Sequence, residues 1–506
     1  MVLSQKSGER TDVAPRGQSA PSGSYLSVGL YATTPSAHSV ELRTLVSILG
    51  SAEVDATIAW GDGTTDTFSA TVLGYPSDIR YTKHTYPAVG SYDVKVTVKD
   101  TAQGLEAVNE VRVVTSGSEF TPHQPTRLLD TREGIGTAKA KVAGRSSVAL
   151  KVAGAAQIPA GVSVVVLNVT VTNTTAAGFV SVQAEKDFAE RAETSNLNYV
   201  AGQSVPNLVV VTVGEGGYVH LFNGGGEAVD LVSDVTGFFT PAPASGYRAL
   251  PSVRAVDTRE GLGTARGPVP GRISFDTEIA GRHGVPRGVT AVALNLTVTA
   301  PQAAGYLTVY PSGQAVPSTS SLNFTAGQSV ANAVIVPVGP DGKISVLNGS
   351  GRAADVVVDV VGYYTPDSRS AFVSAWVPFR IVDSRKDSWG RKAGQLPARS
   401  FFAMRLEGDT TNPRVDGWVL NTTVTNTTGP GFLSVTPDPN FWSDYESGTP
   451  ATPPPPASST LNWTAGAAVP NVAQTPGGKG GIVDIWNQGG QSIDFIVDLL
   501  GLYQTV

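Results

Sequence analysis

The chain has 506 residues, among them 56 glycines and 34 prolines, with a formal net charge of −6 and no cysteine. At about 150 residues per domain, this length predicts three or four domains. The small acidic excess excludes a basic surface for nucleic acid, and the lack of cysteine excludes disulfides, thiolate metal sites and cysteine nucleophiles. No apolar run approaches the ~18 residues that cross a bilayer as a helix, so we expect no membrane insertion.

Residues 1–24 are polar and contain no apolar segment of the kind found in secretory signal peptides. Either a signal is missing from this sequence or the protein is made without secretion, and Met1 favours the second interpretation. The low hydrophobicity predicts a flexible N-terminal arm that becomes ordered only when it binds something.

Residues 25–118 carry a Trp-Gly-Asp-Gly motif at 60–63 and a His-Thr-Tyr motif at 84–86. From residue 92 to residue 98 every second residue is apolar, which places one face of a strand in a core. The two motifs and their separation resemble those of a PKD domain. The resemblance implies an immunoglobulin-like β-sandwich in this region.

The rest of the chain repeats one unit three times. An Arg-x-x-Asp-Thr/Ser-Arg block begins at residues 127, 254 and 380, and a Leu-Asn-x-Thr-Val-Thr block begins at 167, 294 and 420. A Leu-Asn-aromatic-x-Ala-Gly block begins at 197, 322 and 461, and a closing Asp-x-x-Gly-x-aromatic block begins at 234, 359 and 498. Four blocks in one order, three times over, indicate repeated domains.

Each unit contains about eight strand-like runs separated by Gly, Pro and Asn-Thr turns, which predicts an eight-stranded β-sandwich, most simply a jelly roll. We therefore expect an all-β chain of tandem sandwiches that form a stiff, protease-resistant rod. Its expected parts are the arm at 1–24, the PKD-like domain at 25–118, and three jelly-roll-like repeats at 119–243, 244–367 and 368–506.

The repeated blocks place the same polar residues in every unit. These are Arg127, Asp130, Arg132, Asn168 and Asp234 in the first, Arg254, Asp257, Arg259, Asn295 and Asp359 in the second, and Arg380, Asp383, Arg385, Asn421 and Asp498 in the third. We expect the arginines to pair with carboxylates of their own unit and to join strand ends, because architecture recurs in every copy whereas catalysis rarely needs three.

A Ca²⁺ site is the alternative interpretation of these carboxylates, because Asp230 and Asp234 lie four residues apart and so share one face of a strand. The spacing recurs in the other two units. We assign no catalytic, cofactor-binding or metal-binding residue and expect no cofactor. The five histidines have no metal-ligand spacing, and no nucleophile or phosphate-binding motif occurs.

The asparagines of the second block also form Asn-x-Thr sequons. A buried amide that bridges strands is favoured over glycosylation, because the surrounding runs are rich in valine. Trp389, Trp442 and Trp463 are three of the six tryptophans in the third repeat. Core packing is favoured for them over stacking on sugar rings.

The three units resemble modules of actinobacterial cell-surface proteins and of virion proteins from phages that infect these bacteria. The resemblance implies surface modules without known catalysis. We expect a non-enzymatic structural or adhesion protein on the virion surface of an actinobacteriophage, first a minor tail or tail-tip protein and next a capsid surface fibre. The alternative is a secreted actinobacterial cell-wall protein whose signal peptide is missing from this sequence.

On the first hypothesis the arm and the PKD-like domain dock on other virion proteins, and the chain forms a homo-oligomer in the particle. The outer sandwiches would then meet a glycan or protein of the host envelope. Loops that differ between copies, such as the proline-rich stretch 450–457, are the expected binding surfaces. This insertion, and Ser384 in the place of Thr131, argue against a ligand shared by all three copies.

Overall fold

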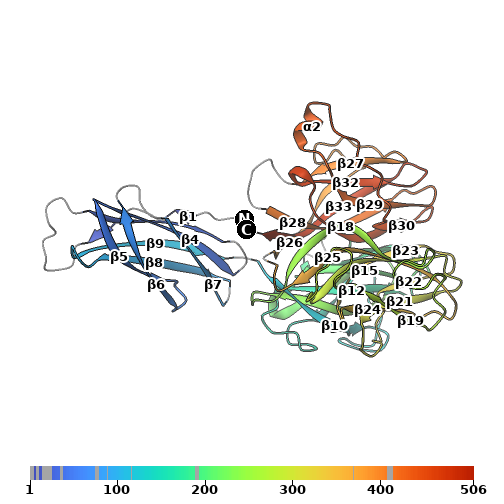
Figure 1. Ribbon diagram of the computed structural model, residues 1–506. Helices are drawn as coiled ribbons and strands as arrows, with labels where there is room; N and C mark the ends of the chain where they lie inside the picture. Colours follow the sequence, from blue (N-terminus) through green and yellow to red (C-terminus); the bar gives the residue numbers. More distant parts are fainter. Residues whose placement is uncertain are drawn as a thin grey trace.

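A computed structural model describes residues 5–6, 11–13, 25–34, 38–73, 79–87, 89–115, 117–187, 193–368, 370–406 and 414–505. Strands make up 57% of the structure and helices 3%, in several separate antiparallel sheets. The predicted all-β class is therefore confirmed. An elongated N-terminal domain lies beside a larger C-terminal body (Figure 1). In the described part of the chain, no helix is long and apolar enough to span a membrane.

The N-terminal domain consists of two antiparallel sheets packed face to face. One sheet has the strand order β1 (Gln5–Lys6), β3 (Leu26–Thr33), β4 (Ser39–Ile48), β7 (Ile79–Thr85). The other has the order β2 (Thr11–Val13), β9 (Leu105–Val114), β8 (Ser91–Asp100), β5 (Ser51–Ala59), β6 (Thr65–Leu73). Alternate residues of β4 and β8 are buried in one shared core, which is the pattern of a sandwich with one solvent face per sheet.

The N-terminal arm differs from the expectation of a free segment. Its pieces β1 and β2 each extend one sheet, with Gln5 opposite Ala32 and Asp12 opposite Ala107. Edge strands carry unpaired backbone N–H and C=O groups, which an extended polar segment can satisfy whatever its side chains are. Hydrophobicity alone therefore does not detect this kind of ordering. The remainder of the arm lies outside the described residues.

Each repeat is an eight-stranded jelly roll. The first contains β10 (Glu119–Asp130), β11 (Ser146–Lys151), β12 (Val164–Thr172), β13 (Gly178–Gln183), β14 (Leu197–Tyr199), β15 (Val205–Thr212), β16 (Tyr218–Asn223) and β17 (Asp230–Thr240). Its sheets have the orders β10-β17-β12-β15 and β11-β16-β13-β14. Counted within the repeat, these orders are 1-8-3-6 and 2-7-4-5, which is jelly-roll topology.

The other two repeats have the same strand order. The second contains β18 (Gly246–Asp257), β19 (Ser274–Glu278), β20 (Ala291–Thr299), β21 (Gly305–Pro311), β22 (Leu322–Phe324), β23 (Val330–Pro337), β24 (Lys343–Asn348) and β25 (Asp355–Thr365). The third contains β26 (Ala371–Asp383), β27 (Ser400–Arg405), β28 (Arg414–Thr425), β29 (Gly431–Pro437), β30 (Leu461–Trp463), β31 (Val469–Thr475), β32 (Ile482–Asn487) and β33 (Asp494–Thr505), with the short helix α2 (Trp442–Glu446) in its insertion.

The three repeats do not follow one another in a rod, so that expectation was wrong. Besides one core inside each repeat, a further apolar cluster draws residues from all three. We call this cluster the axial core. The strands β15, β23 and β31 each touch the other two, so the repeats close into a ring around a pseudo-threefold axis. The residues of β12 show why the repeats assemble. Val164 to Val171 are buried on both faces of the sheet, so the face that points away from the repeat's own core must be covered by another repeat.

Six aromatic residues close the axial core at the end where the chain arrives from the PKD-like domain. They come from the first and last strand of each repeat and are Phe120, Phe239, Tyr247, Tyr364, Phe372 and Tyr503. Backbone pairs also tie the chain together here, because Ser118, just before the first repeat, pairs with Phe372 of the third, and Phe120 pairs with Ser245 of the second. The Phe239 ring of the first repeat stacks on Phe372. The first repeat therefore touches both of the others.

Candidate functional site

The repeated arginines and aspartates form one ion-pair cluster in each repeat. In the first, the Arg127 guanidinium donates from Nε to Asp234 Oδ1 at 2.7 Å and from Nη1 to Asp130 Oδ2 at 2.9 Å. Arg132 donates two hydrogen bonds to the same Asp130, from Nε at 2.9 Å and from Nη2 at 2.7 Å. Asp130 and Asp234 have exposed side-chain fractions of 1% and 2%. The cluster joins β10 to β17, where Arg127 lies opposite Asp234.

Burial and hydrogen bonding act in opposite directions on these carboxyl groups. Hydrogen bonds from Arg132 lower the pKa of Asp130 below its ordinary value. Burial raises the pKa of Asp234, although the Arg127 guanidinium beside it acts in the other direction. Two carboxylates and two guanidiniums thus neutralise one another where β10 meets β17, as a buried charge requires.

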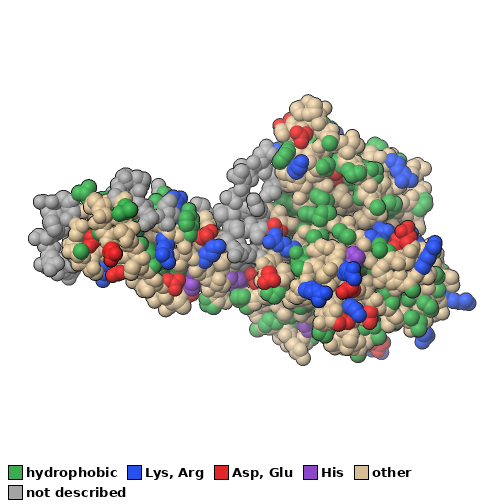
Figure 2. Space-filling view, in the orientation of Figure 1, with side chains coloured by type: hydrophobic (Ala, Val, Ile, Leu, Met, Phe, Trp, Pro, Cys, Tyr) green, Lys and Arg blue, Asp and Glu red, His purple; other side chains and the backbone are tan. Residues whose placement is uncertain are grey.

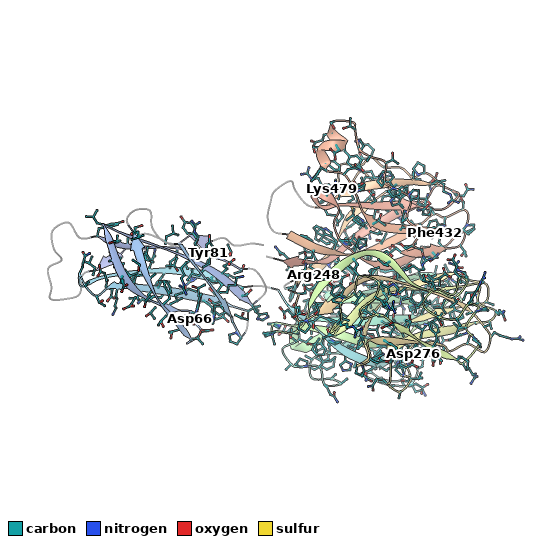
Figure 3. The ribbon with its side chains drawn as sticks, viewed as in Figure 1. Asp66, Tyr81, Arg248, Asp276, Phe432 and Lys479 are labelled. Carbon is teal, nitrogen blue, oxygen red and sulfur yellow. The ribbon has the colours of Figure 1, made fainter. Side chains whose placement is uncertain are left out.

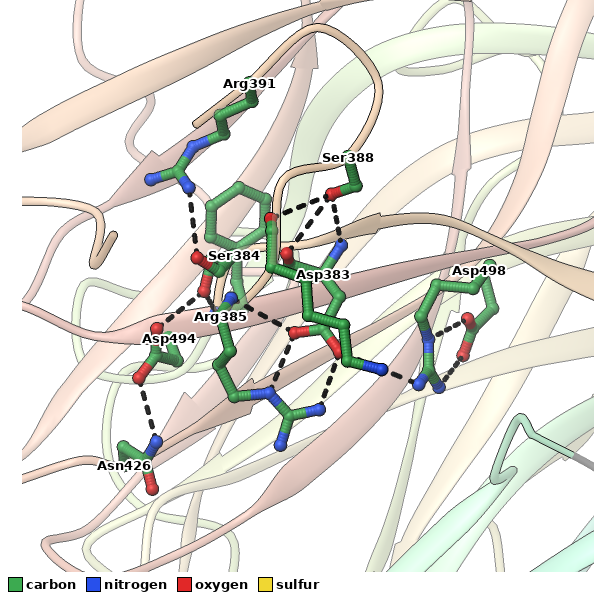
Figure 4. A network of polar contacts seen from close by, with 11 residues as sticks. Asp383, Ser384, Arg385, Ser388, Arg391, Asn426, Asp494 and Asp498 are labelled. Atoms are coloured by element: carbon green, nitrogen blue, oxygen red, sulfur yellow. Dashed lines mark hydrogen bonds and ion pairs between the residues drawn. The ribbon is translucent and has the colours of Figure 1, made fainter. Parts of the chain in front are cut away.

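The second and third repeats contain the same arrangement. Arg254 bonds Asp359 at 2.7 Å, and Arg259 holds Asp257 with two bonds. In the third repeat Arg380 bonds Asp498 at 2.9 Å. There Arg385 holds Asp383 at 2.8 Å from both Nε and Nη2 (Figure 4). Each predicted arginine and aspartate therefore bonds a partner of its own repeat.

The carboxylates of the alternative Ca²⁺ site are also occupied by protein donors. Asp230 accepts hydrogen bonds from Thr131 Oγ1 and Asn173 Nδ2, both at 2.8 Å. In the third repeat Ser384 takes the role of Thr131 and donates to Asp494 Oδ1 at 2.7 Å (Figure 4). The substitution keeps the hydroxyl, and the hydroxyl is what this position uses. Among the described residues no group of three or more His, Asp or Glu is placed to hold a metal ion.

The asparagines of the second block are buried, but they join repeats and not strands within one repeat. Asn168 Nδ2 donates to the Ser320 carbonyl at 2.6 Å, and Asn421 Nδ2 donates to the Ser195 carbonyl at 2.8 Å. Asn295 makes the equivalent bond to Ser459. The three amides therefore bond in one direction around the ring. Burial of these side chains leaves no room for a glycan at the sequons.

A second set of asparagines, which the sequence analysis did not single out, completes this network. Asn332 Nδ2 donates to Asn168 Oδ1 at 3.0 Å, Asn471 to Asn295 at 3.0 Å, and Asn207 to Asn421 at 3.2 Å. All three donors are fully buried. The signal in the sequence is the recurring Val-Pro/Ala-Asn at 205–207, 330–332 and 469–471. The asparagine pairs fix the angle at which the repeats meet.

A cavity of about 530 Å³ opens at the end of the axis away from the aromatic cluster. We call it the axial pocket. Its lining comes from the same segments of each repeat, namely 198–200 with 202–206, 323–325 with 328–331, and 462–464 with 466–470, together with 177–178 and 304–306. These segments contain the third repeated block and the start of the innermost strand. The pocket therefore exists only because three repeats meet.

The axial pocket and the N-terminal domain lie at opposite ends of the ring. Along β12, Val164 lies opposite Phe239 of the aromatic cluster and Val171 lies opposite Val205 of the pocket. At ~3.3 Å per residue these seven residues separate the two ends by about 23 Å. In Figure 1 the lining strands β22 and β30 lie on the side away from the N-terminal domain. In Figure 3 Phe432, which pairs with the lining residue Asn462, lies far from Tyr81.

The proline-rich insertion of the third repeat forms a second, more open hollow, of about 670 Å³, against the second repeat. Residues 453–456 line it together with Arg254, whose Nη2 donates to the Ala457 carbonyl at 3.2 Å. Of the carboxylates that line this hollow, Asp257 and Asp359 are held by Arg254, whereas Glu260 is exposed to solvent. The insertion thus strengthens one of the three junctions.

The three tryptophans have different surroundings. Trp463 is buried in the core of the third repeat, and its Nε1 donates to the Gly429 carbonyl at 2.9 Å. Trp389 is 52% exposed, and Trp442 lies half-buried on α2. Core packing therefore explains only one of them. Charged side chains of both signs are interspersed on the face shown in Figure 2.

The predicted Trp-Gly-Asp-Gly and His-Thr-Tyr motifs meet in the N-terminal domain. Asp62 Oδ1 accepts hydrogen bonds from the Thr64 N–H at 3.0 Å and the Thr64 hydroxyl at 2.6 Å, and its Oδ2 lies 2.8 Å from His84 Nε2. The Trp60 ring stacks on His84 at 4.6 Å. Tyr86 donates its hydroxyl to the Trp60 carbonyl. The motif closes the turn between β5 and β6 onto β7.

Comparison with known families agrees with this geometry, since residues 22–113 match the PKD domain model. These residues form a PKD domain. No curated protein matches the chain. Among solved structures, the chain is similar to the native conformation of E. coli alpha-2-macroglobulin at 11% identity and a TM-score of 0.14, over 93% of this chain and 28% of that chain. The chain thus spans little more than a quarter of that structure, and a likeness of this size carries no argument about fold or function.

Proposed function

We propose that the chain is a non-enzymatic attachment protein of an actinobacteriophage virion, a minor tail or tail-tip protein. In this proposal the PKD domain and the N-terminal arm dock on the particle, and the ring of jelly rolls faces the host envelope. The single observation that carries the proposal is its two-ended layout. The PKD domain joins the ring at the aromatic end, and the axial pocket opens at the other end.

The use of the charged groups inside the repeats supports a role in binding over a role in catalysis. The recurring carboxylates are held by arginines, hydroxyls and amides of their own repeat. A general acid or base needs a carboxyl group within reach of a substrate proton. Carboxylates that tie strands together do not meet this requirement, and the part of the chain that the structure describes places no carboxylate in the axial pocket.

The test is to purify virions and locate the chain in them by mass spectrometry and by labelling with an antibody against the PKD domain. The proposal predicts labelling at the tail, and binding of the purified protein to host envelopes without release of soluble sugar or peptide. Absence of the chain from virions, or release of fragments, would contradict it.

A secreted actinobacterial wall protein remains the second candidate, because the ring would serve a cell surface as well as a particle. The same labelling on growing cells separates the two. Signal on cell walls without phage infection favours the wall protein.

A further inference from the structure

We propose that the axial pocket binds one uncharged oligosaccharide. The inference rests on the attachment role proposed above and names the chemical class of the ligand. The pocket volume, about 530 Å³, lies within the range of small-molecule sites. The asparagine pairs and the axial core hold the three walls of the pocket in place, so the site is preorganised.

The lining excludes a charged ligand. Among the described residues that line the pocket there is no lysine, arginine, histidine, aspartate or glutamate. Moving an ionic group from water into a site without a counter-charge is costly. Phosphate, carboxylate and amine ligands are therefore disfavoured. The polar lining consists of amides and hydroxyls, which are Asn198, Gln203, Ser204, Asn323, Thr325, Gln328, Ser329, Asn462 and Thr464, with the Tyr306 hydroxyl.

Several of these groups have hydrogen-bonding capacity to spare. Gln203 and Gln328 accept backbone hydrogen bonds at Oε1, from Val200 N at 3.1 Å and from Thr325 N at 3.3 Å. Their NH₂ groups remain as donors, with no protein acceptor in the part of the chain that the structure describes. Asn462 Oδ1 also lacks a donor among the described residues, but this oxygen is enclosed by protein and is not open to a ligand. The glutamine donors are followed in the lining by the hydroxyls of Ser204 and Ser329, and this combination matches ligand hydroxyl groups, which both donate and accept.

Apolar surface lies beside these polar groups. The Tyr306 side chain is 40% exposed and Val200 is 44% exposed. A sugar ring has one face of C–H bonds and a rim of hydroxyls, and an aromatic ring beside amides accommodates both. A neutral saccharide therefore fits the lining better than an apolar or an ionic ligand does.

The pocket is not fully symmetric, and this fixes the number of ligands. Gln203 and Gln328 have Ala467 as their counterpart in the third repeat. The aromatic residue of the third block is Tyr199, Phe324 and Trp463 in turn. A single shared cavity with two glutamine walls and one alanine wall suits one ligand in one orientation, not three equivalent ligands.

The test uses the full chain on an array of neutral and acidic oligosaccharides and of uncharged peptides, followed by calorimetry with the neutral sugars that bind. Ala468→Trp fills the pocket from an exposed position of its lining, and Ala465→Trp adds the same ring to the same loop outside the lining. We expect neutral sugars to bind, Ala468→Trp to weaken binding about tenfold or more, and Ala465→Trp to leave it unchanged. Asn323→Ala should weaken binding while the melting temperature stays the same.

Three results would overturn the inference. They are binding of acidic sugars or peptides in place of neutral sugars, no binding of any neutral sugar, and equal binding by the two tryptophan variants. The same variants on host envelopes separate this inference from the proposed function. Envelope binding that survives Ala468→Trp refutes the pocket and keeps the attachment role. If the unmodified chain fails to bind envelopes, the attachment role is refuted. The oligosaccharide array then tests, independently of that role, whether the axial pocket binds a neutral sugar.

Discussion

One glycine in the closing block of every repeat leaves room for an aromatic ring. A side chain at Gly237 would collide with the Phe120 ring, and Gly362 and Gly501 stand in the same relation to Tyr247 and Phe372. None of the three has a left-handed backbone conformation. Space, not conformational freedom, therefore explains the glycine at this position.

Gly237→Ala should destabilise the ring by about 1–3 kcal/mol, because the added methyl group overpacks the aromatic end of the axial core. Calorimetric unfolding of the full chain measures the effect. Gly226→Ala is the matched control, since no atom lies within 4 Å of its added Cβ. If Gly237→Ala and this control unfold at the same temperature, the axial core accommodates the added methyl group without a loss of stability, which contradicts the prediction.

Asp62 makes the stability of the PKD domain depend on acid. Burial raises the pKa of Asp62, but hydrogen bonds from Thr64 and His84 outweigh burial and lower it from 3.8 to about 2. The unfolded chain takes up the proton first, so this stabilisation is complete above pH ~4 and is lost as the pH falls from ~4 to ~2. The Asp62→Asn variant should lose less stability over that range than the unmodified chain. Differential scanning calorimetry of the full chain and of the variant at several pH values between 2 and 5 measures the difference.

At the scale of the element, the ion-pair cluster adds a side-chain tie to the backbone ladder between the first and the last strand of each repeat. Asp130→Ala removes the carboxylate that Arg127 and Arg132 share, so only the buried Asp234 remains to balance their charges. We expect this variant to lower the free energy of unfolding by about 3–5 kcal/mol. Thermal unfolding of the full chain tests this. Asp93→Ala, which breaks an exposed pair with Arg112, should leave the unfolding temperature unchanged. Equal effects of the two variants would contradict the architectural role.

A buried acidic pair distinguishes the third repeat from the other two. Asp484 on β32 is fully buried, and burial together with the neighbouring Asp438 raises its pKa to about 9. The positions equivalent to Asp484 are His220 and Ser345. Between pH ~4 and ~9 the folded chain keeps a proton that the unfolded chain has lost, so the stability of this repeat should fall as pH rises.

Asp484→Asn should therefore raise the unfolding temperature of the third repeat at pH 8 and abolish the decline between pH 5 and pH 8. Differential scanning calorimetry at several pH values measures both effects. A decline of the same slope in the variant would show that another group is responsible.

The sequence predicts the elements better than it predicts their assembly. The Trp-Gly-Asp-Gly motif predicts the PKD domain, and the strand runs between turn residues predict the jelly rolls. The continuous apolar run at Val164–Leu167 even indicates a strand covered on both faces. Nothing local says what covers the second face, because that cover comes from residues such as Ala293 and Val419 in other repeats. The axial pocket was not predictable for the same reason.

At the scale of the whole molecule, the ring is a trimer within one chain. Asn207 of each copy would be able to meet Asn168 of the next, as Asn332 meets Asn168 in the full chain. A fragment of residues 119–243 should therefore form a homotrimer, because its apolar axial face needs two neighbours. Light scattering after size-exclusion chromatography measures the mass. Val166→Lys places a charge on that face and should prevent assembly, whereas a stable monomer of the unmodified fragment would contradict the prediction.

Ring closure also sets the order of events during synthesis. Asn207 finds its partner Asn421 only after 214 further residues have been made. At the usual speed of translation that delay is on the order of 10 to 40 s. Throughout it, the part of the first repeat's apolar face that the third repeat covers stays exposed to the ribosome's surroundings. Neighbouring nascent chains on one messenger RNA carry the same face, so their first repeats compete with the correct third repeat for closure. Slow translation of the last repeat should therefore increase interlocked, domain-swapped oligomers at the expense of single closed rings.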